Sequence, residues 1–316
     1  MGIAYNAKPN LDGLVFAIDA ANPKCYESSA VSGPTVTNIG YRPSVGYSIG
    51  NATLNNVSHG SYPIDALHFA FDGEPNTYIQ SNAMESFGYS TPYWKFLRDG
   101  SSYTIEAWID VRQVDYYTND DSFSEVSAGS AIFDSALHID GDQTGGPGFH
   151  YGFENVYSYA NTRWELRLVA YIDDDSNDVD NRLTFRSNLL HHVDNYSGSN
   201  LISLSQITDA YFMNKMAQFV YTFNGATGKH YINGELKGTA SVGSPTFTTA
   251  SNSTSSHKPQ IGRALTYRVN HTPPNSDYDS KRLHGNLAQF RVHKDVVLTQ
   301  DQIEENFQVF RGRYGI

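Results

Sequence analysis

Alternating apolar and polar residues predict a series of β-strands along this chain. In the clearest case every second residue is apolar: Tyr103, Ile105, Ala107, Ile109 and Val111. Successive side chains of a strand point to opposite faces, so one face of this strand should lie in an apolar core. We expect the strand to be central in its sheet.

Similar patterns predict further strands, at 13–19, 67–71, 77–80, 131–133, 148–153, 165–172, 182–185, 217–223, 229–236 and 287–292. Asn233 and Gly234 interrupt one of these segments, and both residue types suit the positive φ angles of a type I′ hairpin turn. The segments 217–223, 229–236 and 287–292 are therefore predicted to form a β-meander at the edge of a sandwich.

A short helix is predicted near the end of the sequence. Thr299 and Gln302 have the spacing of a capping box, and Leu298 and Ile303 are placed as a hydrophobic staple. Apolar residues then continue at helical spacing, so the helix should pack on the sheets.

Length and composition favour one domain over residues 1–316. A chain of 316 residues with 39% hydrophobic content can bury a substantial core. The many short strands predict an all-β fold, namely an antiparallel two-sheet β-sandwich of the jelly-roll type with long loops and a short C-terminal helix. The segment from about 112 to 216 is expected to be a loop-rich insertion.

Net charge, hydropathy and cysteine content exclude several kinds of partner and cofactor. The formal net charge of -11 disfavours nucleic acid and anionic membranes. No apolar run is long enough for membrane insertion, and residues 1–8 do not have the pattern of a signal peptide. Cys25 is the one cysteine, which excludes an intrachain disulfide and a thiolate zinc cluster. We expect a protein that is made in the cytoplasm and stabilised by packing.

Several stretches together resemble the concanavalin A-like lectin/glucanase superfamily, specifically the laminin-G-like domains of bacteriophage virion structural proteins. They are Gly13–Pro23, Tyr103–Ile109, Tyr231–Thr239, Ile261–Arg263, His284–Val292, Leu298–Thr299 and Phe310–Ile316. The ending Arg311–Ile316, directly after the helix, resembles phage virion proteins in particular.

The resemblance implies a non-enzymatic structural protein on the capsid or tail surface of the virion, with a role in decoration, assembly or host adhesion. The implied partners are other virion proteins, host surface glycans and, by analogy with virion assemblies, further copies of the chain. Two alternatives stay open. One is a lectin, glycoside hydrolase or lyase of the same fold, and the other is a bacterial surface adhesin.

Paired acids are the first test of an enzymatic reading. Glycosidases of this fold place carboxylates on one face of a strand. Glu106 and Asp110 share a face, but Trp108 stands between them where a further acid is wanted. We interpret both as the polar outer face of a half-buried strand, and predict no catalytic residues.

The resemblance also implies calcium, and hard oxygen ligands cluster in two places. Asp140 and Asp142, with Thr144 and Gly145 following, are the better calcium candidates, while the second cluster lies at 173–178. Neither cluster is a complete EF-hand loop. Solvated acidic turns are the alternative explanation.

Aromatic residues in or beside the predicted insertion are candidates for ligand or interface contacts, because sugar rings and protein surfaces both pack on such side chains. They are Tyr116, Tyr117, Tyr151, Tyr157, Tyr159 and Trp164.

Overall fold

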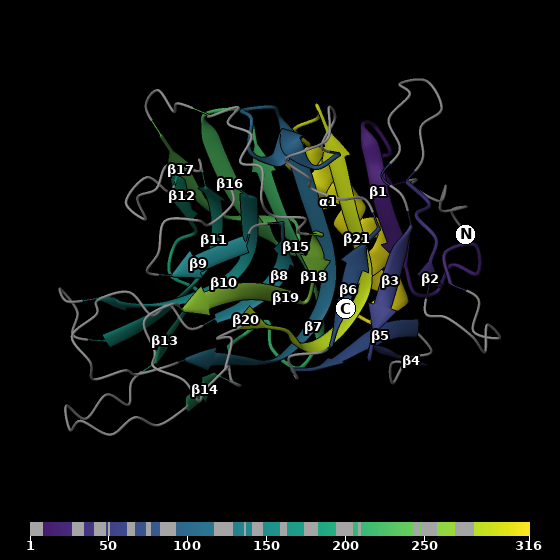
Figure 1. Ribbon diagram of the computed structural model, residues 1–316, viewed down its shortest axis with the longest axis horizontal. Helices are drawn as coiled ribbons and strands as arrows, with labels where there is room; N and C mark the ends of the chain where they lie inside the picture. The colour runs from purple at the N-terminus through teal and green to yellow at the C-terminus, as the bar shows by residue number, and fades with distance from the viewer. Residues whose placement is uncertain are drawn as a thin grey trace, which may run out of the picture.

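The computed structural model describes the greater part of the chain. The described residues are 9–26, 35–40, 49, 51–61, 67–73, 77–82, 93–116, 129–135, 137–140, 148–158, 163–173, 183–193, 205–207, 210–242, 247, 258–268 and 281–316. They form two large antiparallel sheets packed face to face, with a helix on the outside of one of them (Figure 1). The predicted all-β sandwich is confirmed.

The first sheet has the central strand of the molecule, β7, between β15 and β21. In spatial order its strands are β17 (Glu235–Ser241), β16 (Thr227–Ile232), β15 (Met216–Phe223), β7 (Tyr103–Tyr116), β21 (His284–Lys294), β5 (Leu67–Asp72) and β4 (Ser58–Ser61). In addition, β1 (Leu14–Asp19) pairs with β21, and β14 (Ser205–Ile207) pairs with β7.

The second sheet faces the first across the core. In spatial order its strands are β12 (Leu183–Arg186), β11 (Arg163–Asp173), β10 (Gly148–Ser158), β8 (Gly129–Asp134), β18 (Gln260–Ile261), β6 (Tyr78–Ser81), β3 (Ala52–Asn55) and β2 (Thr35–Val36). Another strand, β13 (His191–Val193), pairs with β11. A small sheet joins β20 (Lys281–Arg282), β19 (Arg263–Arg268) and β9 (Leu137–Asp140), with β19 and β9 parallel.

Apolar side chains at alternate positions fill the space between the sheets. The inner face of β7 carries Tyr103, Ile105 and Ala107, and all three are fully buried. Phe149 and Phe153 of β10 oppose them from the second sheet and belong to the same cluster of buried residues. Each large side chain buried in this way contributes about 1.5 to 3 kcal/mol to stability. The predicted central position of the 103–111 strand is confirmed.

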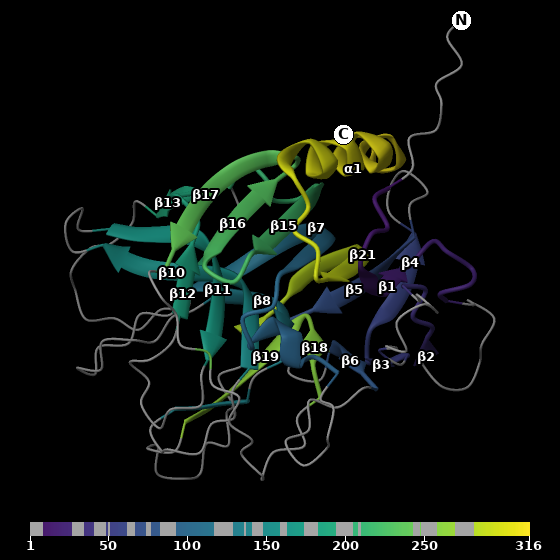
Figure 2. The same cartoon turned by 90° about the horizontal axis from the view of Figure 1, so that it is seen from above.

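The helix α1 (Gln300–Arg311) forms a third layer over the outer face of the first sheet (Figure 2). Its first turn has the predicted capping box, in which Thr299 and Gln302 bond to each other's backbone N–H groups. Leu298 and Ile303 pack in one apolar cluster, as the staple predicts. Within the described residues, no helix has the length and apolar character that a membrane crossing requires.

The helix also covers an aromatic cluster on the outside of the first sheet. Trp108 of β7 is fully buried there, stacked on Phe307 with ring centroids 5.9 Å apart and in contact with Tyr314 at 4.8 Å. Tyr314 lies in the 3-10 turn η4 (Gly312–Tyr314) that follows the helix; another 3-10 turn, η2 (Lys95–Leu97), precedes β7. The strand predicted to be half-buried is therefore buried on both faces.

The last third of the chain differs in one respect from the predicted meander. β15, β16 and β17 are consecutive neighbours, and Asn233 and Gly234 turn between the last two with φ angles of 52° and 80°. The strand at 284–294, however, lies on the far side of β7. The meander prediction is wrong for this strand, because its long-range pairing with β7 cannot be inferred from the local pattern.

The described strands of the segment 112–216 belong to the sandwich. Its strands β8, β10, β11 and β12 form one end of the second sheet, and their inner side chains belong to the shared apolar core. These strands therefore supply part of the shared core, and the bounds of the predicted insertion stay a prediction.

Candidate functional site

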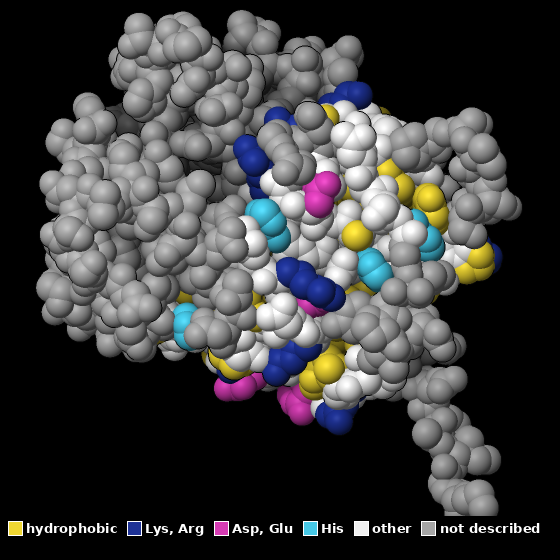
Figure 3. Space-filling model, turned by 90° about the horizontal axis from the view of Figure 1, so that it is seen from below, with side chains coloured by type: hydrophobic (Ala, Val, Ile, Leu, Met, Phe, Trp, Pro, Cys, Tyr) yellow, Lys and Arg dark blue, Asp and Glu magenta, His cyan; other side chains and the backbone are white. Residues whose placement is uncertain are grey.

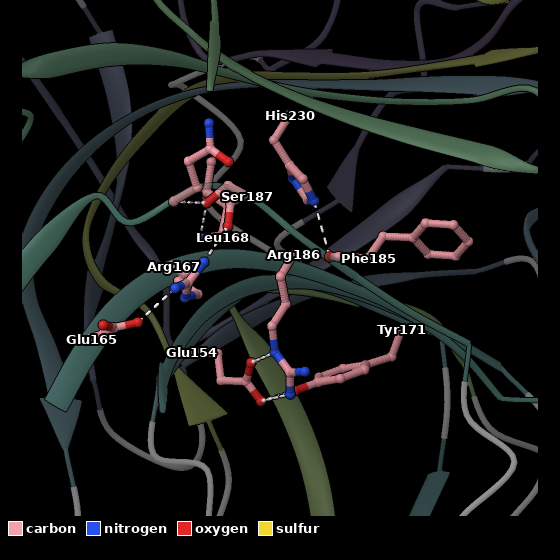
Figure 4. Close-up of polar contacts among 10 residues, drawn as sticks. Glu154, Glu165, Arg167, Leu168, Tyr171, Phe185, Arg186, Ser187 and His230 are labelled. Carbon is pink, nitrogen blue, oxygen red and sulfur yellow. Dashed lines mark hydrogen bonds and ion pairs between the residues drawn. The ribbon is translucent and has the colours of Figure 1, made fainter. Parts of the chain in front are cut away.

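The outer face of the second sheet carries a group of charged side chains on β10, β11 and β12. On these strands Phe153, Leu168 and Phe185 point into the core. Since side chains alternate along a strand, their neighbours point outward. The outward group, which we call the guanidinium face, comprises Glu154, Glu165, Arg167, Tyr171 and Arg186 (Figure 4).

Glu154 is the centre of the first contact on this face. Its Oε2 accepts a hydrogen bond from Arg186 Nε at 2.7 Å, and its Oε1 accepts from Arg186 Nη2 at 3.3 Å. The hydroxyl of Tyr171 also donates to Oε1. Burial alone would lower the pKa of Arg186, but the hydrogen bond to Glu154 and its negative charge raise that pKa above the usual value. The guanidinium therefore stays charged.

Glu165 and Arg167 form the second contact, two residues apart on β11. Arg167 Nη2 donates to Glu165 Oε2 at 2.5 Å, and Nη1 donates to the carbonyl of Ser187 at 2.9 Å. The hydroxyl of Ser187 accepts from the backbone N–H of Leu168 at 3.0 Å. These bonds fix the guanidinium against the end of β12.

Both pairs are asymmetric in exposure. The side chain of Glu154 is 3% exposed and that of Arg186 43%; for Glu165 and Arg167 the values are 7% and 27%. A molecule that approaches this face therefore meets the arginine side chains before the carboxylates. Guanidinium N–H donors suit ligands rich in oxygen acceptors.

A buried histidine adjoins the guanidinium face. His150 Nδ1 lies 3.2 Å from Asp134 Oδ1, and the imidazole stacks on the ring of Tyr171. Next to it, Gly152 leaves no room for a side chain, because a Cβ there would lie 2.2 Å from the carbonyl oxygen of Ser130. His150 is 1% exposed, so this pair supports the sheet and is closed to a substrate.

The two acids considered as a catalytic pair are both held in structural contacts. Glu106 Oε1 accepts from Trp108 Nε1 at 3.0 Å, and Oε2 accepts from Asn306 Nδ2 of the helix at 3.1 Å. Asp110 Oδ2 accepts from Arg112 Nε at 2.8 Å and from Asn286 at 3.0 Å. Both carboxylates are buried. The sequence predicted that both acids lie on a polar outer face. That prediction is wrong, because both carboxylates are buried and the helix covers Glu106.

The structure locates four of the six aromatic residues that were predicted to make ligand or interface contacts. Tyr151 is fully buried in the core between the sheets, so its prediction as a surface contact is corrected. Tyr116 lies in β7, Tyr157 in β10 and Trp164 in β11. Tyr157 and Trp164 are directly opposite each other in the pairing of β10 with β11. The structure does not describe the side chains of these three residues.

The remaining predicted residues cannot be compared. Tyr117, Tyr159 and Asp142 lie outside the described residues, and Asp140 ends β9 with an undescribed side chain. In the part of the chain that is described, no group of three His, Cys, Asp or Glu side chains is placed to hold a metal. Calcium binding at Asp140 and Asp142 stays a prediction, which a rise in Tm at saturating calcium would support.

Sequence reasoning missed the guanidinium face. Its signal is Glu165-Leu-Arg167, in which opposite charges two residues apart share one face of a strand. The partnership of Glu154 with Arg186 joins residues 32 apart and has no local signal.

From below, the described surface mixes Lys, Arg, His, acidic and apolar side chains, and none of these kinds forms a continuous patch there (Figure 3). The fold and the paired charges define the class of the molecule: an antiparallel two-sheet β-sandwich with a helix over one sheet and arginine donors on the outside of the other.

No protein-family model matches the sequence, and no curated protein matches it either. Among solved structures, the chain is similar to domain 4 of AbnA, an extracellular arabinanase from Geobacillus stearothermophilus, with 13% identity over 93% of this chain and 98% of that one and a TM-score of 0.42. The chain is also similar to the binding domain of Paraclostridial Mosquitocidal Protein 1, with 14% identity over 95% of this chain and 53% of that one and a TM-score of 0.47. For a Trypanosoma rangeli sialidase the identity is 12% over 95% of this chain and 33% of that one, and the TM-score is 0.46. The chain thus spans about half of the toxin domain and a third of the sialidase. All three TM-scores are below 0.5, so the function proposed below does not depend on them.

Proposed function

We propose that this protein is a non-enzymatic component of a bacteriophage particle surface, which adheres to host-surface glycans through the guanidinium face. One observation carries the adhesive part of the proposal: on this face the carboxylates are buried and paired, while the arginine side chains above them are partly exposed. Sugar hydroxyl and carboxylate oxygens are acceptors that guanidinium donors bind well.

The same contacts argue against bond cleavage at this face. A glycosidase needs a carboxylic acid and a carboxylate that both reach the scissile bond. Glu154 is enclosed by Arg186 and Tyr171, and Glu165 is bonded to Arg167. Both carboxylates are buried, so they would have to lose these partners before they could transfer a proton to a substrate.

The bacteriophage part of the proposal is supported by the sequence resemblance, above all by the ending Arg311–Ile316. Other virion proteins are the partners that this location implies. Proteomics of purified particles would test it, since the protein should copurify with virions and be depleted from preparations of host envelope alone.

Glycan binding by matched arginine variants tests the adhesive part. Arg186→Ala should weaken binding to array glycans at least about tenfold, the loss expected when a charge-assisted hydrogen bond is removed. Arg112→Ala is the control, because Arg112 is also exposed over a buried carboxylate, that of Asp110, but on the first sheet.

Three results would count against this proposal. Equal losses in both variants, or no glycan bound by the intact protein, would remove the guanidinium face as a binding site. Release of reducing sugar from a bound polysaccharide would favour the alternative function, a glycoside hydrolase or lyase of the same fold.

A further inference from the structure

Four polar groups lie inside the apolar core between the two sheets. They are the hydroxyls of Tyr103, Tyr151 and Tyr221 and the imidazole Nδ1 of His230. All four side chains are fully buried. Among the described contacts, none of these four atoms has a hydrogen bond of ordinary geometry, and the one contact between two of them is that of the Tyr103 and Tyr221 hydroxyls, which lie close enough to interact.

The four side chains are neighbours, although they come from four strands. The ring of Tyr221 lies 4.9 Å from that of His230, 5.7 Å from that of Tyr151 and 6.0 Å from that of Tyr103, centroid to centroid. Tyr151 also stacks on His230 at 5.9 Å. The four side chains therefore form one cluster.

The hydroxyls interact electrostatically. Burial raises the pKa of Tyr103 well above its usual value, and the neighbouring hydroxyl of Tyr221 raises it further. Burial, and after it the electrostatic interaction with the neighbouring Tyr151 hydroxyl, raises the pKa of Tyr221. Burial also raises the pKa of Tyr151. All three phenols are thus neutral, and each can both donate and accept a hydrogen bond.

Gly228 of β16 makes space for the cluster. A Cβ on this residue would lie 2.5 Å from the Tyr221 hydroxyl oxygen and 2.8 Å from the ring of Phe185. A side chain at position 228 would occupy the place where the Tyr221 hydroxyl now ends.

His230 supplies the acceptor that completes the set. Its Nε2 donates to the carbonyl oxygen of Phe185 at 3.0 Å, so that nitrogen carries the proton and Nδ1 presents a lone pair. Burial lowers the pKa of His230 to about 4, which keeps the ring neutral at physiological pH.

We propose that ordered water is bound inside the sandwich, among the hydroxyls of Tyr103, Tyr151 and Tyr221 and Nδ1 of His230. Buried water typically bonds to two to four polar groups that have no other partner. Four buried polar groups left unpaired would cost a large part of the stability of a folded protein. Water that donates to Nδ1 and exchanges hydrogen bonds with the phenols removes this cost.

A high-resolution crystal structure of the full chain tests the proposal. We expect density for at least one water within hydrogen-bond distance of two or more of these four groups. Density showing the groups bonded only to one another or to protein, with no water among them, would overturn the proposal, whether or not any variant folds.

Counting long-lived internal water by magnetic relaxation dispersion gives a second test in solution. The double variant Tyr151→Phe with Tyr221→Phe should lose at least one long-lived water relative to the natural chain. Phe153→Leu is the control, since Phe153 lines the same core without a polar group, and it should keep the full number. An unchanged count in the double variant would contradict the proposal.

Discussion

At the residue scale, the buried carboxylate of Glu106 connects its own strand to two neighbouring strands and to the helix. Glu106 belongs to β7, and it accepts hydrogen bonds from Trp108, from Gln218 of β15 and from Asn306 of α1. Arg291 of β21 lies 3.8 Å from its Oε2. One side chain thus holds three strands and the helix together.

Glu106→Gln should lower the free energy of unfolding by about 2 to 3 kcal/mol, because an amide N–H₂ would replace an oxygen that faces donors and leave Arg291 without its countercharge. Urea unfolding measures this change. Glu305→Gln, on the exposed side of α1, is the control and should change stability by less than about 0.5 kcal/mol. Equal stability of Glu106→Gln and the natural chain would show that the network is unimportant.

His230 predicts a pH dependence of stability. Its pKa falls from 6.5 to about 4 on folding, so between these values the unfolded chain binds more protons than the folded one. Stability contributed by the neutral ring is complete above pH 6.5 and is lost as the pH falls towards 4, by about 3 kcal/mol in total.

Chemical denaturation at a series of pH values checks this expectation. The variant His230→Phe should show a shallower loss over the same range. It should keep part of the slope, because burial also lowers the pKa of His293. Parallel curves for the variant and the natural chain would contradict the assignment.

At the element scale, the two ends of the described chain are fastened to each other. Arg313, just after α1, donates to both carboxylate oxygens of Asp19 at the end of β1, at 2.7 and 3.0 Å. Gln289 of β21 donates to the same carboxylate. Two of the stretches that carry the sequence resemblance, 13–23 and 310–316, are therefore partners in one contact that holds the helix on the first sheet.

Arg313→Ala should loosen this layer. Because both side chains are partly exposed, we expect a loss of only about 1 kcal/mol in global stability. Amide hydrogen exchange in α1 should nevertheless become clearly faster. Arg311→Ala is the control, because Arg311 bonds within the C-terminal segment, to Gln308 and Ile316. Faster exchange in the control alone would contradict the role of Arg313.

The sequence pattern predicts where strands and helices lie better than it predicts which of their side chains other parts of the chain bury. Alternation located β7 and β15, and the capping residues located α1, because these signals depend on near neighbours. The burial of Trp108 depends on a helix about 200 residues further along the chain, and the burial of Tyr151 depends on Tyr221 and His230 of the opposite sheet. Such long-range packing leaves no local mark, so an exposed and a buried aromatic residue look alike in the sequence.

At the scale of the whole molecule, we expect the positions of the charged side chains to decide which ligands bind more than the net charge does. The chain carries a net charge of -11, yet Glu154, Glu165 and Asp110 are buried and each is paired with a more exposed arginine. Long-range fields should disfavour polyanions, while short-range contacts on the guanidinium face favour oxygen acceptors. We therefore expect adhesion to depend on hydrogen bonding at that face, and Arg186 to matter more than Arg112.

The central claim is that the protein binds glycans without cleaving them. Its most direct test is to incubate the protein for a long time with an oligosaccharide that it binds, recover the oligosaccharide and determine its mass by mass spectrometry. We predict that the oligosaccharide is released intact from the natural chain and is retained much less by Arg186→Ala. Recovery of shorter or unsaturated fragments that require the intact protein would contradict the account, because it would show that the sandwich cleaves its ligand.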